Sequence, residues 1–300
     1  MRPPTSAPTL VDRVPYEAFV DRPILKAPAR VLVWFIVNVE YWSIDRPMPR
    51  TVLSPPMGQS LLPDLPNWAW HEYGMRAGFW RIHEALRARA IVPTLALNGM
   101  VCQRYPRVAQ AALDAGWEFM GHGYVQGPMH KLEDQAAEIA RTMDAIRAFT
   151  GAAPKGWESP GLTETGETLD LLSTAGVEYV ADWVIDDQPT WLRASPRPVL
   201  SVPYTVELND IPVHAIQQHD SDELRRRGVA QLDRLWLEGR RNPRVMAVSI
   251  HPYITGVPHR IAAFEALLDA ILAKKEVAIM TGGAIADWYR AQVPAPGATR

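Results

Sequence analysis

The chain has 300 residues, of which 47% are hydrophobic and 21% are charged, as is ordinary for a globular protein. The formal net charge is −2 and there is no basic block, so nucleic acid and anionic membranes are not expected as partners. No apolar run approaches the roughly 20 residues that span a bilayer. The first residues lack the apolar segment of a secretion signal, so we expect a cytoplasmic protein. Cys102 is the only cysteine, which excludes an intrachain disulfide and a thiolate metal cluster.

Apolar segments alternate with amphipathic ones along the chain. The first predicted strand, Val31 to Val39, is apolar and β-branched almost throughout, as a strand buried on both faces should be. A loop over residues 40–70 follows, and its length indicates a lid, a pocket wall or a subunit contact. The other predicted strands are 91–97, 117–120, 155–158, 179–182, 200–202, 213–216, 245–250 and 277–280, and the predicted helices are 75–90, 101–115, 132–150, 167–175, 220–237 and 261–274.

This regular alternation is typical of a parallel α/β sheet in one domain, and around seven strands in series favour a barrel. We predict a catalytic barrel over residues 29–292, preceded by an extended N-terminal arm at 1–28 and followed by a C-terminal tail at 293–300.

Two histidines, His122 and His251, each follow a predicted strand. The carboxyl ends of parallel strands gather at one face, where chemistry is usually located. Because imidazole titrates near neutral pH, the pair predicts an acid/base or metal site. The structural alternative is that each histidine only closes its strand.

A family resemblance is visible in four segments: Trp70–Ile82, Gly121–Tyr124, Pro203–Asp210 and Ser249–Pro252. With the order of elements, they resemble the polysaccharide deacetylase superfamily (carbohydrate esterase family 4-like) over residues 31–289. The resemblance implies a distorted (β/α)7 barrel in a single domain. Pro203–Asp210 resembles in particular the branch of metal-independent allantoinases and cyclic imide hydrolases.

The chain departs from the metal-binding motifs of that superfamily. Asn38 and Glu40 stand where metal-dependent members have two aspartates, Gln126 replaces the second histidine of a pair, and Glu158 replaces an arginine. Zinc favours three or four strong donors. We therefore expect no cofactor; if zinc or another divalent metal is present, its ligands would be Glu40, His122 and Gln126.

The resemblance also implies the site residues. Asp182 matches a strand-end aspartate and His251 the general acid, and a carboxylate bonded to an imidazole raises its basicity, so we predict that these two pair. The predicted catalytic residues are Glu40, His122, Asp182 and His251. The predicted substrate-binding residues are Asn38, Tyr73, Gln126, Glu158, Trp183, Asn209 and Asp210.

Several of these residues have a structural alternative. A salt bridge with Arg46 or Arg76 is the alternative for Glu40. Glu158 would serve equally as a helix cap, and Asn209 with Asp210 as a turn. Tyr73 would equally have a packing role.

The predicted function is hydrolysis of a carbon–nitrogen bond other than a peptide bond, in a small cyclic amide or imide such as a ureide. Glu40 or the Asp182–His251 pair would activate water, His251 would protonate the departing nitrogen, and His122 would stabilise the oxyanion. The alternatives are a metal-dependent deacetylase of N-acetyl sugars and a catalytically inactive barrel that binds a ligand. The expected partners are the small molecule and further copies of the chain, in a dimer or tetramer.

Overall fold

Strand β1 pairs with three other strands, β2, β8 and β9, in a single curled sheet. The computed structural model describes residues 9–55, 58–59 and 61–297. The strand order is β6-β7-β5-β4-β3-β2-β1-β8, with β9 also beside β1, and only the pair β6 and β7 is antiparallel. The strands are β1 Val31–Val39, β2 Thr94–Leu97, β3 Glu118–Gly121, β4 Gly156–Trp157, β5 Tyr179–Val180, β6 Thr190–Leu192, β7 Val199–Ser201, β8 Arg244–Ile250 and β9 Val277–Ile279.

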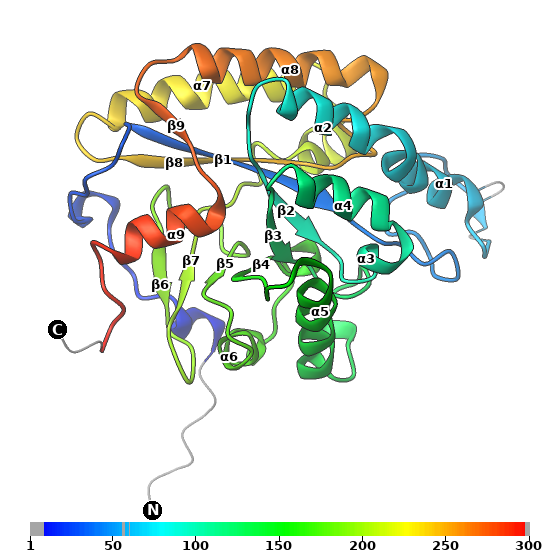
Figure 1. The fold of residues 1–300 in the computed structure, drawn as a ribbon, viewed down its shortest axis with the longest axis horizontal. Helices are drawn as coiled ribbons and strands as arrows, with labels where there is room; N and C mark the ends of the chain where they lie inside the picture. The colour runs from blue at the N-terminus through cyan, green and yellow to red at the C-terminus, as the bar shows by residue number, and fades with distance from the viewer. Residues whose placement is uncertain (1–8, 56–57, 60, 298–300) are drawn as a thin grey trace, which may run out of the picture.

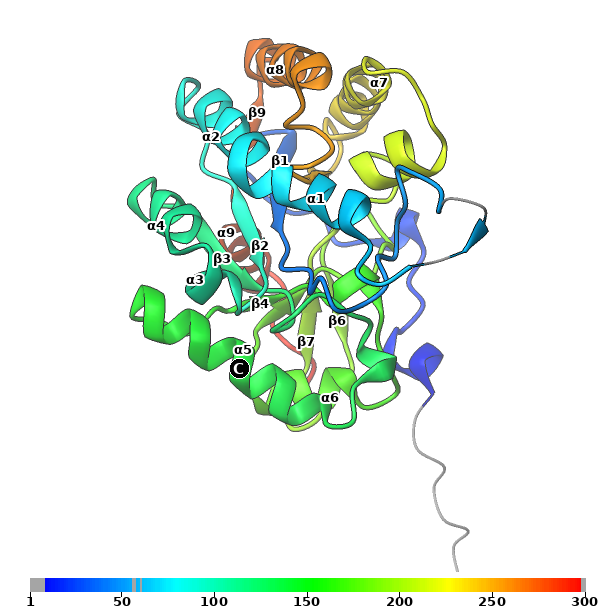
Figure 2. The same ribbon diagram turned by 90° about the vertical axis from the view of Figure 1, so that its right-hand side faces the viewer.

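Helices cover the outer side of this sheet. Figure 1 shows α7 and α8 side by side along β1 and β8, whereas α5 and α6 lie at the opposite side of the molecule. The turned view in Figure 2 shows the sheet curling into a half-barrel, which confirms the predicted single-domain α/β barrel. The helices are α1 Leu65–Tyr73, α2 Phe79–Arg87, α3 Val101–Arg104, α4 Pro106–Asp114, α5 Gln135–Thr150, α6 Thr168–Thr174, α7 Glu223–Glu238, α8 Pro258–Ala273 and α9 Gly282–Arg290, with π-helical turns at Gly74–Gly78 and Ile211–Ile216.

The period of two along each strand sorts side chains between the barrel interior and the helix layer. In β1, Leu32, Trp34 and Ile36 pack inside with Tyr179, while the alternate residues pack against the helices. In β8, Val245 and Ala247 likewise face inward. Both faces of β1 are therefore buried, which explains its continuous apolar sequence.

Several elements of the structure differ from the prediction. Residues 213–216 are not a strand but part of the π-helical turn Ile211–Ile216, which Pro212 opens at a position where a missing N–H costs no helical hydrogen bond. The loop after β1 ends earlier than predicted, because Asp64 caps α1 by accepting a hydrogen bond from the backbone N–H of Asn67. Strand β6 and helix α9 were absent from the prediction.

The N-terminal segment from residue 9 lies against the barrel. Its Arg13 is buried and forms two hydrogen bonds to the Asp170 carboxylate, at 2.5 and 2.7 Å. The predicted boundaries at 28 and 293 stay predictions, and parts of both end segments lie outside the described residues. Within the described part of the chain, no helix combines the length and apolarity needed to cross a membrane.

Candidate active site

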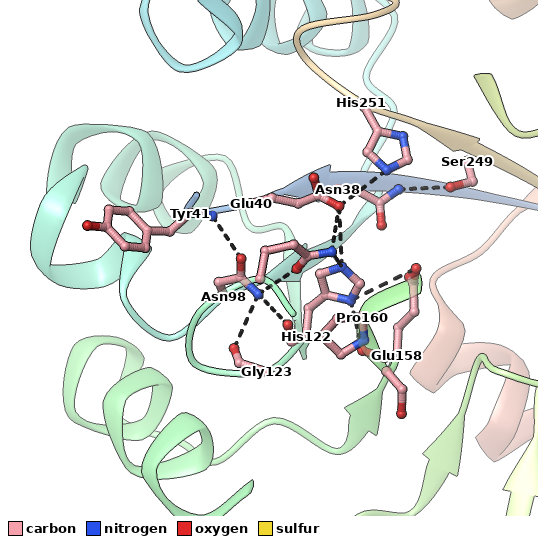
Figure 3. A network of polar contacts seen from close by, with 12 residues as sticks. Asn38, Glu40, Tyr41, Asn98, His122, Gly123, Glu158, Pro160, Ser249 and His251 are labelled. Atoms are coloured by element: carbon pink, nitrogen blue, oxygen red, sulfur yellow. Dashed lines mark hydrogen bonds and ion pairs between the residues drawn. The ribbon is translucent and has the colours of Figure 1, made fainter. Parts of the chain in front are cut away.

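The carboxyl ends of four parallel strands bring polar side chains to one edge of the half-barrel. Glu40 follows β1, His122 follows β3, Glu158 follows β4 and His251 follows β8. Each of these residues continues the inward-facing register of its strand. The alternation that fills the barrel interior with apolar side chains therefore also brings these four polar side chains together at the end of the interior. Figure 3 shows His122 and His251 approaching the Glu40 carboxylate from different sides.

All four residues line one cavity of about 300 Å³. The loop after β1 supplies part of its wall through Trp42, Pro49 and Arg50, as its length predicted. The cavity is small enough to enclose a compact ring or a single sugar unit.

Glu40 is held as a carboxylate. Its Oε2 accepts a hydrogen bond from Trp42 Nε1 at 2.9 Å, and its Oε1 lies 3.6 Å from His122 Nε2 and 3.5 Å from His251 Nε2. Burial opposes the charge, but the two imidazoles outweigh it and set the pKa of Glu40 well below its usual range. Among the described residues, its ion-pair contacts are with these histidines and not with Arg46 or Arg76.

His251 pairs with Asp210, and the predicted pairing with Asp182 is wrong. Asp210 Oδ1 accepts from His251 Nδ1 at 2.7 Å, while its Oδ2 accepts from the His251 backbone N–H at 2.7 Å and from Thr255 Oγ1 at 2.6 Å. Burial would lower the pKa of His251, but Asp210 and then Glu40 raise it to about 9. His251 is therefore an imidazolium at neutral pH, with Nε2–H directed to the cavity.

Asp182 fails to reach His251 because of strand register. In β5, Tyr179 and Ala181 face the barrel interior, so Val180 and Asp182 face the helix layer. Asp182 Oδ1 accepts from the backbone N–H of Ser159 at 2.6 Å, which fixes the loop after Glu158.

A second acid, Glu164, lies against Asp182. Burial, followed by the Asp182 charge, raises the pKa of Glu164 to about 10, and burial also raises the pKa of Asp182. Glu164 Oε2 and Asp182 Oδ2 have no other partner among the described residues, so a proton on Glu164 joins the two carboxyl groups. This pair lies outside the cavity lining.

The orientation of Gln126 follows from a backbone group. Asn98 Oδ1 accepts from the backbone N–H of Tyr41 at 2.8 Å, so its Nδ2 faces Gln126 Oε1 at 3.0 Å. The nitrogen of the Gln126 amide is thereby directed at Glu40 Oε1, at 2.9 Å, and at His122 Nε2, at 3.1 Å.

His122 consequently has its proton on Nδ1, which donates to the backbone carbonyl of Glu158 at 2.8 Å, while Nε2 accepts from Gln126. In this arrangement Nε2 has no proton for an oxyanion, so the role predicted for His122 does not fit. Burial opposes charge on the ring, but Glu158 and then Glu40 offset it and raise the pKa of His122. Protonation would exchange the Gln126 contact for an ion pair with Glu40.

Glu158 is the fourth titratable group at the cavity. Burial raises its pKa to about 7, against the attraction of His122, whose Nδ1 is 4.0 Å from its Oε1. The same oxygen accepts from Tyr204 at 3.0 Å. Tyr204 contacts Ser249 Oγ at 2.6 Å, and Ser249 accepts from Asn38 Nδ2 at 2.8 Å. Glu158 therefore ends a buried chain of hydroxyl groups and does not cap a helix.

The other predicted substrate-binding residues divide into three groups. Asn209 and Gln126 line the cavity, whereas Asn38 lies in the polar layer beneath it. Tyr73 accepts from Arg81 at 2.6 Å and Trp183 donates to Glu164 at 3.0 Å, so both are used outside the cavity lining. Sequence reasoning missed Asn98, Arg50, Tyr204 and Ser249; only Asn98 and Ser249 had a usable signal, as polar residues in the inward register of β2 and β8.

The donors at this site do not suit a divalent cation. A metal ligand must present a lone pair, but the Gln126 amide presents N–H groups toward Glu40 and His122. Asn38, in the interior layer, donates its amide to Ser249. Among the residues that the structure describes, no cluster of three or more histidine, cysteine, aspartate or glutamate side chains is placed to hold a metal ion.

Comparison with known proteins identifies the class of this fold and site. Residues 70–180 match a family model described as polysaccharide deacetylase, and this match confirms the resemblance predicted from the sequence. A Schizosaccharomyces pombe protein that is named provisionally as a polysaccharide deacetylase is 26% identical over 74% of this chain and 76% of its own length.

Two solved structures resemble the whole barrel. The crystal structure of PuuE allantoinase has a TM-score of 0.83 at 25% identity and covers 91% of this chain and 95% of its own. A Pseudomonas aeruginosa PAO1 protein described as a probable polysaccharide deacetylase has a TM-score of 0.78 at 25% identity, covering 89% of this chain and 93% of its own.

Proposed function

We propose that this protein hydrolyses a carbon–nitrogen bond other than a peptide bond, in a small cyclic amide or imide of the ureide type, without a metal ion. The observation that supports this best is the arrangement around Glu40. One carboxylate oxygen lies within 3.6 Å of two imidazoles, of which His251 is protonated and His122 offers a lone pair. A base and an acid are thus set side by side at one cavity.

His122 is the proposed base. Its tautomer is fixed by the Glu158 carbonyl, and its raised pKa matches a base that works near neutral pH. It would take a proton from the attacking water while the Glu40 carboxylate orients that water and stabilises the new charge on the ring. Glu40 itself, with its depressed pKa, is a weak base, so we assign it to positioning and electrostatics.

His251 is the proposed acid. The attack of water turns the carbonyl carbon tetrahedral, and collapse of this adduct breaks the carbon–nitrogen bond as Nε2–H protonates the departing nitrogen. Asp210 keeps the ring charged and oriented before the reaction. Positioned acid and base groups each contribute factors of about 100 to 10,000. Gln126 is our candidate for stabilising the oxyanion, through the amide hydrogen that is freed when the attacking water takes its place at His122 Nε2.

Two observations support this substrate class: the size of the cavity and the similarity of the fold to a solved allantoinase structure. A cavity of about 300 Å³ suits one small ring better than a polymer. An allantoinase is among the similar structures, and a ureide ring opens through this chemistry.

The second candidate is a metal-dependent deacetylase of N-acetyl sugars, which the family description favours. The Gln126 amide argues against a metal-dependent reaction, because it directs N–H groups and not a lone pair at Glu40 and His122. A third is an inactive barrel that only binds a ligand. Location in the cytoplasm and assembly as a dimer or tetramer stay predictions.

The test is turnover of a panel of hydantoins, cyclic imides, allantoin and N-acetyl sugars by protein purified without chelator, with and without a later chelator treatment. We expect ring opening that survives the chelator and is lost in His251→Ala. Deacetylation that requires stoichiometric zinc would replace our proposal with the second candidate. Normal turnover by His251→Ala would overturn the mechanism.

A further inference from the structure

A second cavity, of about 470 Å³, adjoins the catalytic cavity. The two cavities share five lining residues from the loops after β1 and β3: Trp42, Pro49, Gln126, Gly127 and Pro128. Gln126, whose amide contacts Glu40 and His122, therefore lines the second cavity as well. The second cavity is thus one side chain away from the reacting groups, and the proposed mechanism uses none of the residues that line it alone.

Positive charge dominates the lining of the second cavity. Its charged lining residues are three cations and one acid: Arg46, Lys131, Arg141 and Glu138. Among the residues that the structure describes, none of the three cations forms a salt bridge. Glu138 does not neutralise them, because its Oε1 accepts from the backbone N–H groups of Tyr124 and Val125, at 3.0 and 3.4 Å. The three cations are therefore available to a ligand.

Arg141 is held in place by an aromatic ring. Its guanidinium carbon lies 3.6 Å from the centroid of the Tyr124 ring, and Tyr124 is buried. Stacking fixes the plane of a guanidinium but leaves the N–H groups at its edge available. Glu138, one turn earlier on α5, holds the backbone at Tyr124 through its hydrogen bond. Arg141 is thus oriented before a ligand binds, which reduces the entropy that binding costs.

Apolar side chains form much of the remaining wall of the second cavity. They come from the same two loops: Trp42, Pro47, Met48, Pro49, Pro128 and Leu132. Apolar walls reduce the contact of a bound group with water, so the attraction between an anion and the three cations is stronger here than on an open surface. Cations in an apolar recess favour a negatively charged ligand over a neutral one of the same shape.

We propose that the second cavity binds an anionic oxygen group, a carboxylate or a phosphate, through Arg46, Lys131 and Arg141. The guanidinium fork matches the oxygen atoms of both groups, and lysine adds a point charge. Two sources have this chemistry: an anionic substituent on the ring that the catalytic cavity holds, and a separate small anion. The first source narrows the substrate class to charged rings and rests on the proposed function; the second is independent of that function.

The experiment uses one probe for each source. A hydantoin with a propionate side chain represents a charged substrate, the same hydantoin with a propionamide side chain is its neutral match, and inorganic phosphate represents a separate anion. Calorimetry at low and high salt measures binding of each probe to the wild-type protein, to the triple variant Arg46→Gln/Lys131→Gln/Arg141→Gln and to Arg107→Gln. Arg107 is the control, an exposed arginine of α4 that lines neither cavity.

We expect at least one anionic probe to bind the triple variant roughly 10- to 100-fold more weakly than the wild-type protein, and to bind the wild-type protein more weakly at high salt. The propionamide compound should stay within about 3-fold. A loss for the propionate assigns the site to the substrate, and a loss confined to phosphate assigns it to a separate anion; either supports the proposal. No binding of either anion, unchanged binding of both by the triple variant, or equal losses for the propionamide or in Arg107→Gln would overturn it. Because binding is read without turnover, absence of hydrolysis would refute the proposed function without deciding this result.

Discussion

Gly78 packs directly against the backbone of Pro252, the residue that follows the proposed acid His251. A Cβ at position 78 would overlap the carbonyl oxygen of Pro252, and it would also lie close to Gly256. The π-helical turn Gly74–Gly78 thus approaches the catalytic loop as closely as two backbones can, which explains a glycine at this position.

We expect Gly78→Ala to move the His251 loop and to lower kcat about 10- to 100-fold, because small misplacements of a catalytic group are costly. The free energy of unfolding should fall by about 1–3 kcal/mol. Gly166→Ala is the control, since a Cβ there meets nothing within 4 Å. Denaturant titration and steady-state kinetics measure both effects; a Gly78→Ala enzyme with unchanged kcat would show that this contact does not position His251.

The pairing of His251 with Asp210 predicts a pH profile. Activity requires neutral His122 and charged His251, so kcat/KM should fall on the acid side as His122 protonates and on the alkaline side near pH 9 as His251 loses its proton. Asp210→Asn removes the charge that raises the pKa of His251, so the alkaline limb should move to lower pH and kcat should drop about 100- to 10,000-fold.

The variant Asp182→Asn tests whether His251 pairs with Asp210, as in the structure, or with Asp182, as predicted from the sequence. Asp182 contacts Ser159 and not His251, so its substitution should leave the alkaline limb in place. Measuring kcat/KM from about pH 5 to 10 for both variants tests the assignment. A shift of the alkaline limb in Asp182→Asn but not in Asp210→Asn would reverse it.

The barrel and much of its active edge were predictable because they follow from periodicity. Val31–Val39 was predicted with the bounds that the structure gives it, and Glu40, His122, Glu158 and His251 were all singled out as residues at strand ends. The alternation of side chains along β5 also explains why Asp182 lies apart from these four residues, because Asp182 shares the register of the outward-facing Val180.

Several contacts within the site had no local signal in the sequence. Asp210 follows an isolated parallel bridge between Asn209 and Ser249, and the contact with His251 spans 41 positions along the chain. Arg50 depends on the path of a loop that no periodicity describes. The direction of the Gln126 amide depends on Asn98 and, through it, on a backbone N–H. Tertiary contacts set all three.

Gln126→His tests the argument about metal donors. The substitution replaces an amide that presents N–H groups by an imidazole with a lone pair, next to Glu40 and His122. Three strong donors suit zinc, so we expect zinc affinity to rise by at least about 10-fold over the wild-type protein. Calorimetric titration with zinc measures it, and Gln126→Leu is the control that loses the amide without gaining a donor. Equal, stoichiometric zinc binding by all three proteins would contradict the argument.

The buried pair of Glu164 and Asp182 predicts how stability depends on pH. The folded protein holds a proton on Glu164 up to about pH 10, whereas the unfolded chain releases it near the ordinary value of 4.5. A raised carboxyl pKa stabilises the folded state most below the ordinary value, and this stabilisation is lost as the pH rises toward about 10. Glu164→Gln cannot ionise and keeps a donor toward Asp182, so its free energy of unfolding should fall less between about pH 6 and 9 than that of the wild-type protein. Glu133→Gln, at an exposed position, should follow the wild-type slope. Denaturant unfolding at several pH values measures these slopes, and identical slopes for the wild-type protein and Glu164→Gln would show that Glu164 does not hold this proton.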